Sequence, residues 1–314
     1  MDEDQHHPGG LPEGTFTPDV GDFLLDSVTG SAWLAVAAGY LVAGRAAALR
    51  GRPDWPVRRT ASWLTGTALG FAVTVGPLAR AAHSDFAAHM AVHLVLGMLV
   101  PLLLVLGAPA TLFLRAVPVQ VGRRYSRIAG AVPLRVLAHP GTALLLTTVP
   151  LALIYGSGRS LDIVHHPVLG PLVHLHFLAA GFLFTYSVIG LDPNPHRARP
   201  WVRGSAIVAG IAAHGVVAKQ MIAVGQRGVP ADDVEQGAQL MYYGGDVVHV
   251  LVLVVFCAQV YRSTGRRLAD ADRRGKHTRG AESEPRHTRG RKLSGVALHH
   301  SPGKCPDIVG NGQA

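Results

Sequence analysis

The sequence has few of the residues that stabilise small secreted or soluble proteins. It contains two cysteines among 314 residues, Cys257 inside an apolar run and Cys305 near the end, and they form no CxxC motif. Two such cysteines define neither a disulfide framework nor a thiolate metal site. Charged residues are also scarce, at 16% of the chain, while 48% of residues are hydrophobic and the mean hydropathy is +0.26. This composition is typical of a polytopic membrane protein and excludes an ordinary soluble domain.

The first 30 residues contain no Lys or Arg, although seven acidic residues lie there. The basic segment and the apolar core of a signal peptide are both missing from this stretch. We therefore expect residues 1–30 to form a retained, mostly flexible acidic arm outside the membrane. The adjacent His6 and His7 in this arm are interpreted as solvated side chains.

Seven apolar runs follow the acidic arm. About 20 apolar residues, each rising roughly 1.5 Å, cover the roughly 30 Å hydrocarbon core of a bilayer. The sequence therefore predicts an all-α membrane protein in which residues 31–262 form a bundle of about seven transmembrane helices. The runs lie near residues 31–49, 60–79, 86–106, 141–155, 171–190, 204–224 and 240–261.

Positive charge alternates between the loops. Arginines gather between the first and second, third and fourth, and fifth and sixth runs, whereas the other loops carry only Arg80, Arg159 and Arg227. The positive-inside rule then places the N-terminus outside and the C-terminus in the cytoplasm. We expect the basic residues 263–314 to form a disordered cytoplasmic tail near the bilayer surface. The formal charge of +9 reflects this topology, so we expect no nucleic-acid partner.

The third apolar run begins with a group of possible metal ligands. His89 and His93 stand at i and i+4, and Met90 lies three residues before His93, so two imidazoles and a thioether share one helical face. Ionisable groups inside a membrane usually carry function, and imidazole with thioether suits copper. A single histidine would more simply bond a neighbouring helix, and a methionine is an ordinary core residue. Two histidines on one face favour a metal site.

Four of the predicted helices place polar groups at a similar depth in the outer leaflet. His174 and His176 are about 200° apart on a regular helix, so only one faces the site, and we prefer His176. Asp246 could be a metal ligand, a residue that fixes an imidazole tautomer or the counter-charge of Lys219, and the last two roles together are favoured over direct ligation. The predicted metal ligands are His89, His93, Met90, His176, His214 and His249. The predicted accessory residues are His83, His174, Met221, Asp246, Tyr242 and Lys219.

Four stretches of the sequence resemble those of a known family. They are AHMAVHLVLGMLVPLLLVLGAPATLFLRA at 88–116, HLHFLAAGFLFTYSVIGLDPNP at 174–195, AHGVVAKQM at 213–221 and QLMYYGGDVVHVLVLV at 239–254. The LGAP turn and the FLFTYSVIGLDP segment are the most specific of these. Over roughly residues 31–262, the chain resembles the CtaG-type cytochrome c oxidase assembly factors, which are polytopic bacterial membrane proteins.

The resemblance implies a multi-pass protein of the bacterial plasma membrane that helps to mature a haem-copper oxidase without being an enzyme. Copper would be bound transiently, and the oxidase subunits and the lipid bilayer would be the partners. Neutral imidazoles with one or two thioethers suit such an exchangeable site. Two alternatives stay open. One is a b-type haem electron carrier with His93 and either His176 or His249 as axial ligands, and the other is a cation or proton transporter.

Overall fold

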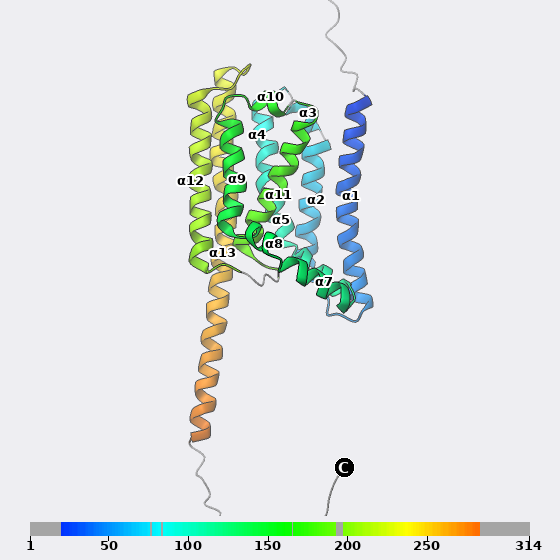
Figure 1. Ribbon diagram of the computed structural model, residues 1–314, viewed down its shortest axis with the longest axis vertical. Helices are drawn as coiled ribbons and strands as arrows, with labels where there is room; N and C mark the ends of the chain where they lie inside the picture. Colours follow the sequence, from blue (N-terminus) through cyan, green and yellow to red (C-terminus); the bar gives the residue numbers. More distant parts are fainter. Residues whose placement is uncertain (1–19, 76, 83, 165, 193–196, 283–314) are drawn as a thin grey trace, which may run out of the picture. The chain divides into compact units, whose positions relative to one another are not determined.

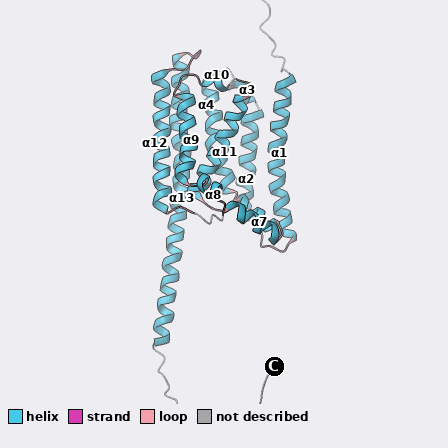
Figure 2. Cartoon of the chain, in the orientation of Figure 1, coloured by secondary structure: helices cyan, strands magenta, loops and turns pink. Residues whose placement is uncertain are grey.

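Every regular element in the described part of the chain is a helix (Figures 1 and 2). The computed structural model describes residues 20–75, 77–82, 84–164, 166–192 and 197–282. The elements are α1 (Val20–Leu49), α2 (Val57–Val75), α3 (Pro77–Ala81), α4 (Phe86–Leu94), the π-helix η1 (Val95–Leu99), α5 (Val100–Leu106), α6 (Pro109–Ala116), α7 (Val119–Ala129), α8 (Val132–Leu137), α9 (Pro140–Tyr155), α10 (Ser160–Val164), α11 (Leu169–Ile189), α12 (Pro200–Val224) and α13 (Ala231–Glu282).

Five apolar stretches are long enough to cross a membrane. They are Phe23–Leu49, Phe86–Leu106, Leu169–Ile189, Pro200–Val224 and Ala231–Arg266. The two other predicted runs also form helices, but α2 has 19 residues and carries Arg58 and Arg59 in its first turn, while α9 has only 16 residues. The prediction of an all-α fold is confirmed for the described residues, and five of the predicted runs form helices that could span a membrane.

The two ends of the predicted membrane domain differ from the structure. Helix α1 begins at Val20, so residues 20–30 of the expected flexible arm are helical, and residues 1–19 lie outside the described residues. Asp22 favours this earlier start, because an acidic side chain stabilises the first turn of a helix. Helix α13 continues to Glu282, since the Ala, Arg and Lys residues that follow position 262 are good helix formers. The expected disorder of 283–314 falls outside the described part of the chain.

Among the described residues, those up to Ser263 form one compact unit, and those from Thr264 to Glu282 belong to a second unit. Within the first unit, α1 packs on α2, and α2 packs on α5 (Figure 1). Helix α11 lies against α5, η1 and α9, and α9 in turn packs on α12. Tyr40 ties α1 to this bundle, because its ring stacks on Trp63 at 4.7 Å and its hydroxyl donates to the Gly107 carbonyl at 2.8 Å.

The rod formed by α4, η1 and α5 contains a π-helical segment next to a proline. The amide of Val100 donates to the carbonyl of Val95, one residue further back than in an α-helix. Pro101 follows directly and cannot donate a backbone hydrogen bond of its own. Helix α11 approaches this point closely, since a Cβ atom at Gly181 would overlap the carbonyl oxygen of Gly97. Small residues thus allow the two helices to pack backbone against backbone.

Candidate functional site

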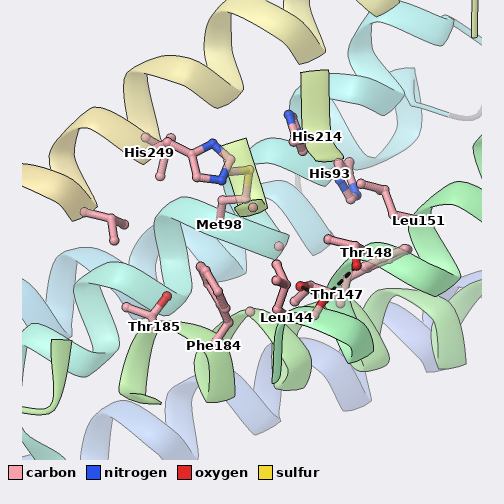
Figure 3. Close-up of a pocket in the computed structure, with 16 residues that line it drawn as sticks. His93, Met98, Leu144, Thr147, Thr148, Leu151, Phe184, Thr185, His214 and His249 are labelled. Carbon is pink, nitrogen blue, oxygen red and sulfur yellow. Dashed lines mark hydrogen bonds between the residues drawn. The ribbon is translucent and has the colours of Figure 1, made fainter. Parts of the chain in front are cut away.

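A cavity of about 60 Å³ lies between the α4–η1 rod and helices α9, α11, α12 and α13 (Figure 3). Three histidines from three different helices line it: His93 on α4, His214 on α12 and His249 on α13. The remaining polar or sulfur-bearing side chains in its wall are Met98, Thr147, Thr148 and Thr185. The structure thus brings together three of the six residues that the sequence predicts as metal ligands.

His249 is held in one orientation by its own helix. Its Nδ1 atom donates to the carbonyl of Gly245, one turn earlier, at 2.9 Å. Because Nδ1 carries the proton in this bond, a neutral ring has its lone pair on Nε2. Metal-binding histidines commonly use their second nitrogen in this way, and the bond fixes both the tautomer and the ring direction.

His214 presents a buried nitrogen that lacks a hydrogen-bond partner among the described residues. Its side chain is 6% exposed, and its Nε2 atom is buried without such a bond. A buried polar atom left unsatisfied costs about 1–3 kcal/mol, so a nitrogen in this position is favourably placed to bind a ligand or a water molecule. Gly245 makes room for this ring, because a Cβ atom at that position would overlap the imidazole.

His93 is packed between aromatic rings. Its ring meets Phe177 edge-on at 4.9 Å and lies 5.4 Å from the ring of Tyr155. The side chain is 6% exposed and faces Gly97 of the π-helix, where a Cβ atom would stand 3.8 Å from Nδ1. His93 is therefore fixed by its neighbours and still lines the cavity.

Two of the three rings, those of His214 and His249, are spaced as imidazoles that could share an ion, whereas His93 lies slightly farther away. The centre of His214 lies 5.5 Å from that of His249 and 6.4 Å from that of His93. With a metal–nitrogen bond of roughly 2 Å and about 1.1 Å from nitrogen to ring centre, two ligating rings are about 5.2 Å apart at a tetrahedral angle and about 6.3 Å apart when opposed. Within the described residues, no three His, Cys, Asp or Glu side chains already form a metal-binding group, so side-chain rotation would have to complete the coordination.

The thioether in the cavity wall belongs to Met98 and not to the predicted Met90. Met90 is fully buried in an apolar cluster with Phe86, Val234 and Met241. Met98 lies five residues after His93, which on a regular α-helix is about 140° away around the axis. The π-helical segment holds an extra residue in its turn and brings Met98 to the face of His93. Alpha-helical periodicity could not have identified this residue.

His89 and His93 share a helix face, as predicted, but only His93 lines the cavity. His89 is 1% exposed, and its Nε2 atom lies 2.9 Å from the hydroxyl oxygen of Tyr155. The ring of His174 on α11 lies 6.1 Å from that of His89. His89 therefore contacts Tyr155 and His174 outside the cavity wall, whereas His93 lines the cavity.

His176 lies outside the cavity wall and contacts a helix backbone instead. Its Nε2 atom donates to the carbonyl of Leu146 at 3.0 Å. Leu146 stands four residues before Pro150, whose missing N–H leaves that carbonyl without its helical partner. An unsatisfied carbonyl is costly in a membrane, so this bond gives His176 a structural role. His174 does not line the cavity either, so neither of these two histidines stands in its wall.

The other predicted accessory residues are not in the cavity wall. Met221 is fully buried in the apolar cluster around Met90, and the ammonium of Lys219 lies 5.4 Å from the ring centre of Tyr242. Asp246 is half-buried on α13, three residues before His249. His83 lies outside the described residues.

Residues 38–263 match the family described as cytochrome c oxidase caa3 assembly factor, Caa3_CtaG. The chain belongs to this family. The resemblance identified from the four sequence stretches is thereby confirmed, and every residue in the wall of the cavity falls within the matched part of this family member.

Several mycobacterial proteins are similar to this assembly-factor family member. An uncharacterized protein of Mycobacterium bovis and one of Mycobacterium tuberculosis are each 37% identical over 185 residues, and one of Mycobacterium leprae is 34% identical over 180 residues. Each match covers 55% of this chain and 27% of the relative, so the chain spans about a quarter of the length of these curated relatives. No solved structure matches the chain.

Proposed function

We propose that this protein supports the assembly of a caa3-type cytochrome c oxidase by holding a copper ion in the cavity between His93, His214 and His249. The Nε2 atom of the buried His214, which has no hydrogen-bond partner among the described residues, carries this proposal. That nitrogen lies in a wall with two further imidazoles and a thioether. A buried site with these donors and no thiolate suits a soft ion that has to leave again.

Each side chain would contribute one donor atom. His249 would offer Nε2, because its Nδ1 is engaged by Gly245, and His214 would offer its unpartnered Nε2. Met98 would offer sulfur from the same wall. Copper bound in this way would leave by stepwise replacement of one ligand by another from the receiving protein, without any bond-breaking chemistry in this chain.

We further propose that the chain crosses the membrane seven times, because α2 and α9 would cross it together with the five long apolar stretches. The N-terminus would lie outside. The alternation of arginine-rich loops supports this orientation. It would place the ends of α4 and α11 that carry His89 and His174 toward the outer surface. A reporter fused after Arg262 should then be cytoplasmic, and one inserted between Gln226 and Gln239 should be external. The reverse pattern would contradict a delivery site in the outer leaflet.

Copper titration of the purified full-length protein tests the site. Cu(I) should be withdrawn from a chromophoric chelator by the wild type, and the alanine variants of His93, His214 and His249 should each lose most of this ability. The matched control is His6→Ala with His7→Ala, which should bind as the wild type does. Equal binding by all variants would contradict the proposal, and a Soret band in the absorption spectrum of the purified protein would favour the haem alternative.

A further inference from the structure

His89 and His174 contact each other next to the cavity, but neither side chain lines its wall. Their ring centres are 6.1 Å apart, which falls within the range of about 5.2 to 6.3 Å for two imidazoles on one ion. His89 is the fourth residue of α4 and His174 is the sixth of α11, so both stand near the beginnings of their helices. His174 is half-buried, whereas His89 and His93 are buried.

Tyr155 separates this pair from the cavity. Its ring centre lies 5.9 Å from that of His89 and 5.4 Å from that of His93, and its hydroxyl is bonded to Nε2 of His89. The side chain of Tyr155 is 1% exposed and is therefore buried between the two groups. Tyr155 therefore contacts one histidine of each group, at the point where an ion would pass from His89 to His93.

A buried glutamine fixes the position of Tyr155. The side-chain amide of Gln226 donates to the backbone carbonyl of Tyr155 at 2.9 Å, and its oxygen accepts from the hydroxyl of Ser160 at 2.6 Å. These bonds hold the end of α9 against the loop that follows α12. The tyrosine backbone is thus anchored, and movement of its hydroxyl needs only side-chain rotation.

We propose that His89 and His174 form a second copper-binding pair, called here the access pair, and that the hydroxyl of Tyr155 competes with copper for His89. This inference rests on the proposed function of the cavity. Cu(I) accepts two nitrogen ligands, so the access pair can hold it without a third donor. Arrival of the ion displaces the Tyr155 hydroxyl from Nε2 of His89, and exchange of His89 for His93 then moves the ion into the cavity.

The exchange changes neither charge nor oxidation state. The Nε2 atom of His89 and the hydroxyl oxygen of Tyr155 are hydrogen-bonded at 2.9 Å. In the proposed exchange the hydroxyl is the donor of this bond, so that nitrogen already carries its lone pair. Copper takes the place of that hydrogen bond, and the phenol keeps its proton. No proton, oxidant or reductant is required, because only the ligands of the ion are replaced.

Copper stoichiometry and loading rate of the full-length protein test the access pair. The wild type should bind a second Cu(I) ion, and His174→Gln should lose it while keeping the ion of the cavity. The doubly substituted His214→Ala, His249→Ala protein should lose the ion of the cavity and keep the ion of the access pair. His174→Gln should also load the cavity several-fold more slowly from a Cu(I) chelate. Monodisperse elution and an unchanged Tm establish that each variant is folded.

Tyr155→Phe provides a readout that a merely structural role would not produce. Removing the competing hydroxyl should tighten the access pair by about fivefold, the equivalent of one ordinary hydrogen bond, and leave the affinity of the cavity unchanged. A single copper ion per wild-type chain, unaffected by His174→Gln and lost in the double variant, would overturn the access pair and leave the cavity proposal standing. Absence of copper from the wild type would overturn both.

Discussion

Asp192 and Thr111 are joined by two hydrogen bonds, from the backbone amide of Thr111 at 2.8 Å and from its hydroxyl at 2.6 Å, both to Oδ1 of the carboxylate. The second carboxylate oxygen accepts from the amide of Ala110 at 3.2 Å. Asp192 thus caps the first turn of α6, which follows the left-handed residue Ala108 of the LGAP turn. The two most specific family stretches meet at this contact.

Asp192→Ala should destabilise the protein without removing copper. Loss of a helix cap costs about 1–2 kcal/mol, and here the cap also joins α6 to the end of α11. Thr111→Val is the milder matched variant, because it removes only the hydroxyl bond. Thermal unfolding in detergent should show a lower Tm for Asp192→Ala than for Thr111→Val. Loss of copper by folded Asp192→Ala at a normal Tm would contradict this assignment.

His176→Ala should likewise affect stability and not metal binding. The substitution leaves the Leu146 carbonyl without a donor, at a cost of about 1–3 kcal/mol. Leu175→Ala is the control on the same helix, since that side chain is 60% exposed on the outside of the bundle. A His176→Ala protein that keeps its Tm but loses copper would identify His176 as a ligand after all.

Met98→Leu and Met90→Leu should have different consequences for copper. Leucine keeps the apolar volume but lacks sulfur, so Met98→Leu should weaken Cu(I) binding by about tenfold, or roughly 1.4 kcal/mol. Met90→Leu should bind normally, because Met90 is packed in an apolar cluster. Chelator competition with both purified variants measures this difference. Weaker Cu(I) binding by Met90→Leu than by Met98→Leu would contradict the assignment of Met98 as the thioether of the site.

Gly245→Ala should disturb His214 specifically. A methyl group at this position overlaps the imidazole, although alanine is the better helix former by about 1 kcal/mol. Gly265→Ala, on the same helix, meets nothing within 4 Å and is the matched control. We expect Gly245→Ala to lose Cu(I) affinity and Gly265→Ala to keep it. Equal affinities in the titration would show that the position of His214 is unimportant for binding.

The sequence predicted the helical, membrane-spanning character because long apolar runs leave few other structures for a chain in lipid. It also identified His93, His214 and His249, because polar groups in such runs are rare and therefore stand out. The beginning of α1 and the end of α13 could not be predicted from the sequence. A helix rich in charged residues and a solvated tail have similar compositions, so composition does not tell them apart.

The finer arrangement of the site depends on features that have no clear sequence signal. Met98 enters the cavity wall through a π-helical turn, and Tyr155 meets His89 only because α9 packs beside α11. The role of His176 follows from Pro150 on another helix, so the two residues become related only in three dimensions. Spacing within one helix cannot supply such contacts.

The copper content and activity of the caa3-type oxidase, measured in cells whose only copy of this protein carries His93→Ala, test the copper site in the cavity. The variant should insert and accumulate at the wild-type level, while the oxidase should lack copper and activity. Cells carrying the His6→Ala, His7→Ala protein should have a fully active oxidase. A normally metallated, active oxidase in the His93→Ala cells would contradict a copper site in this cavity.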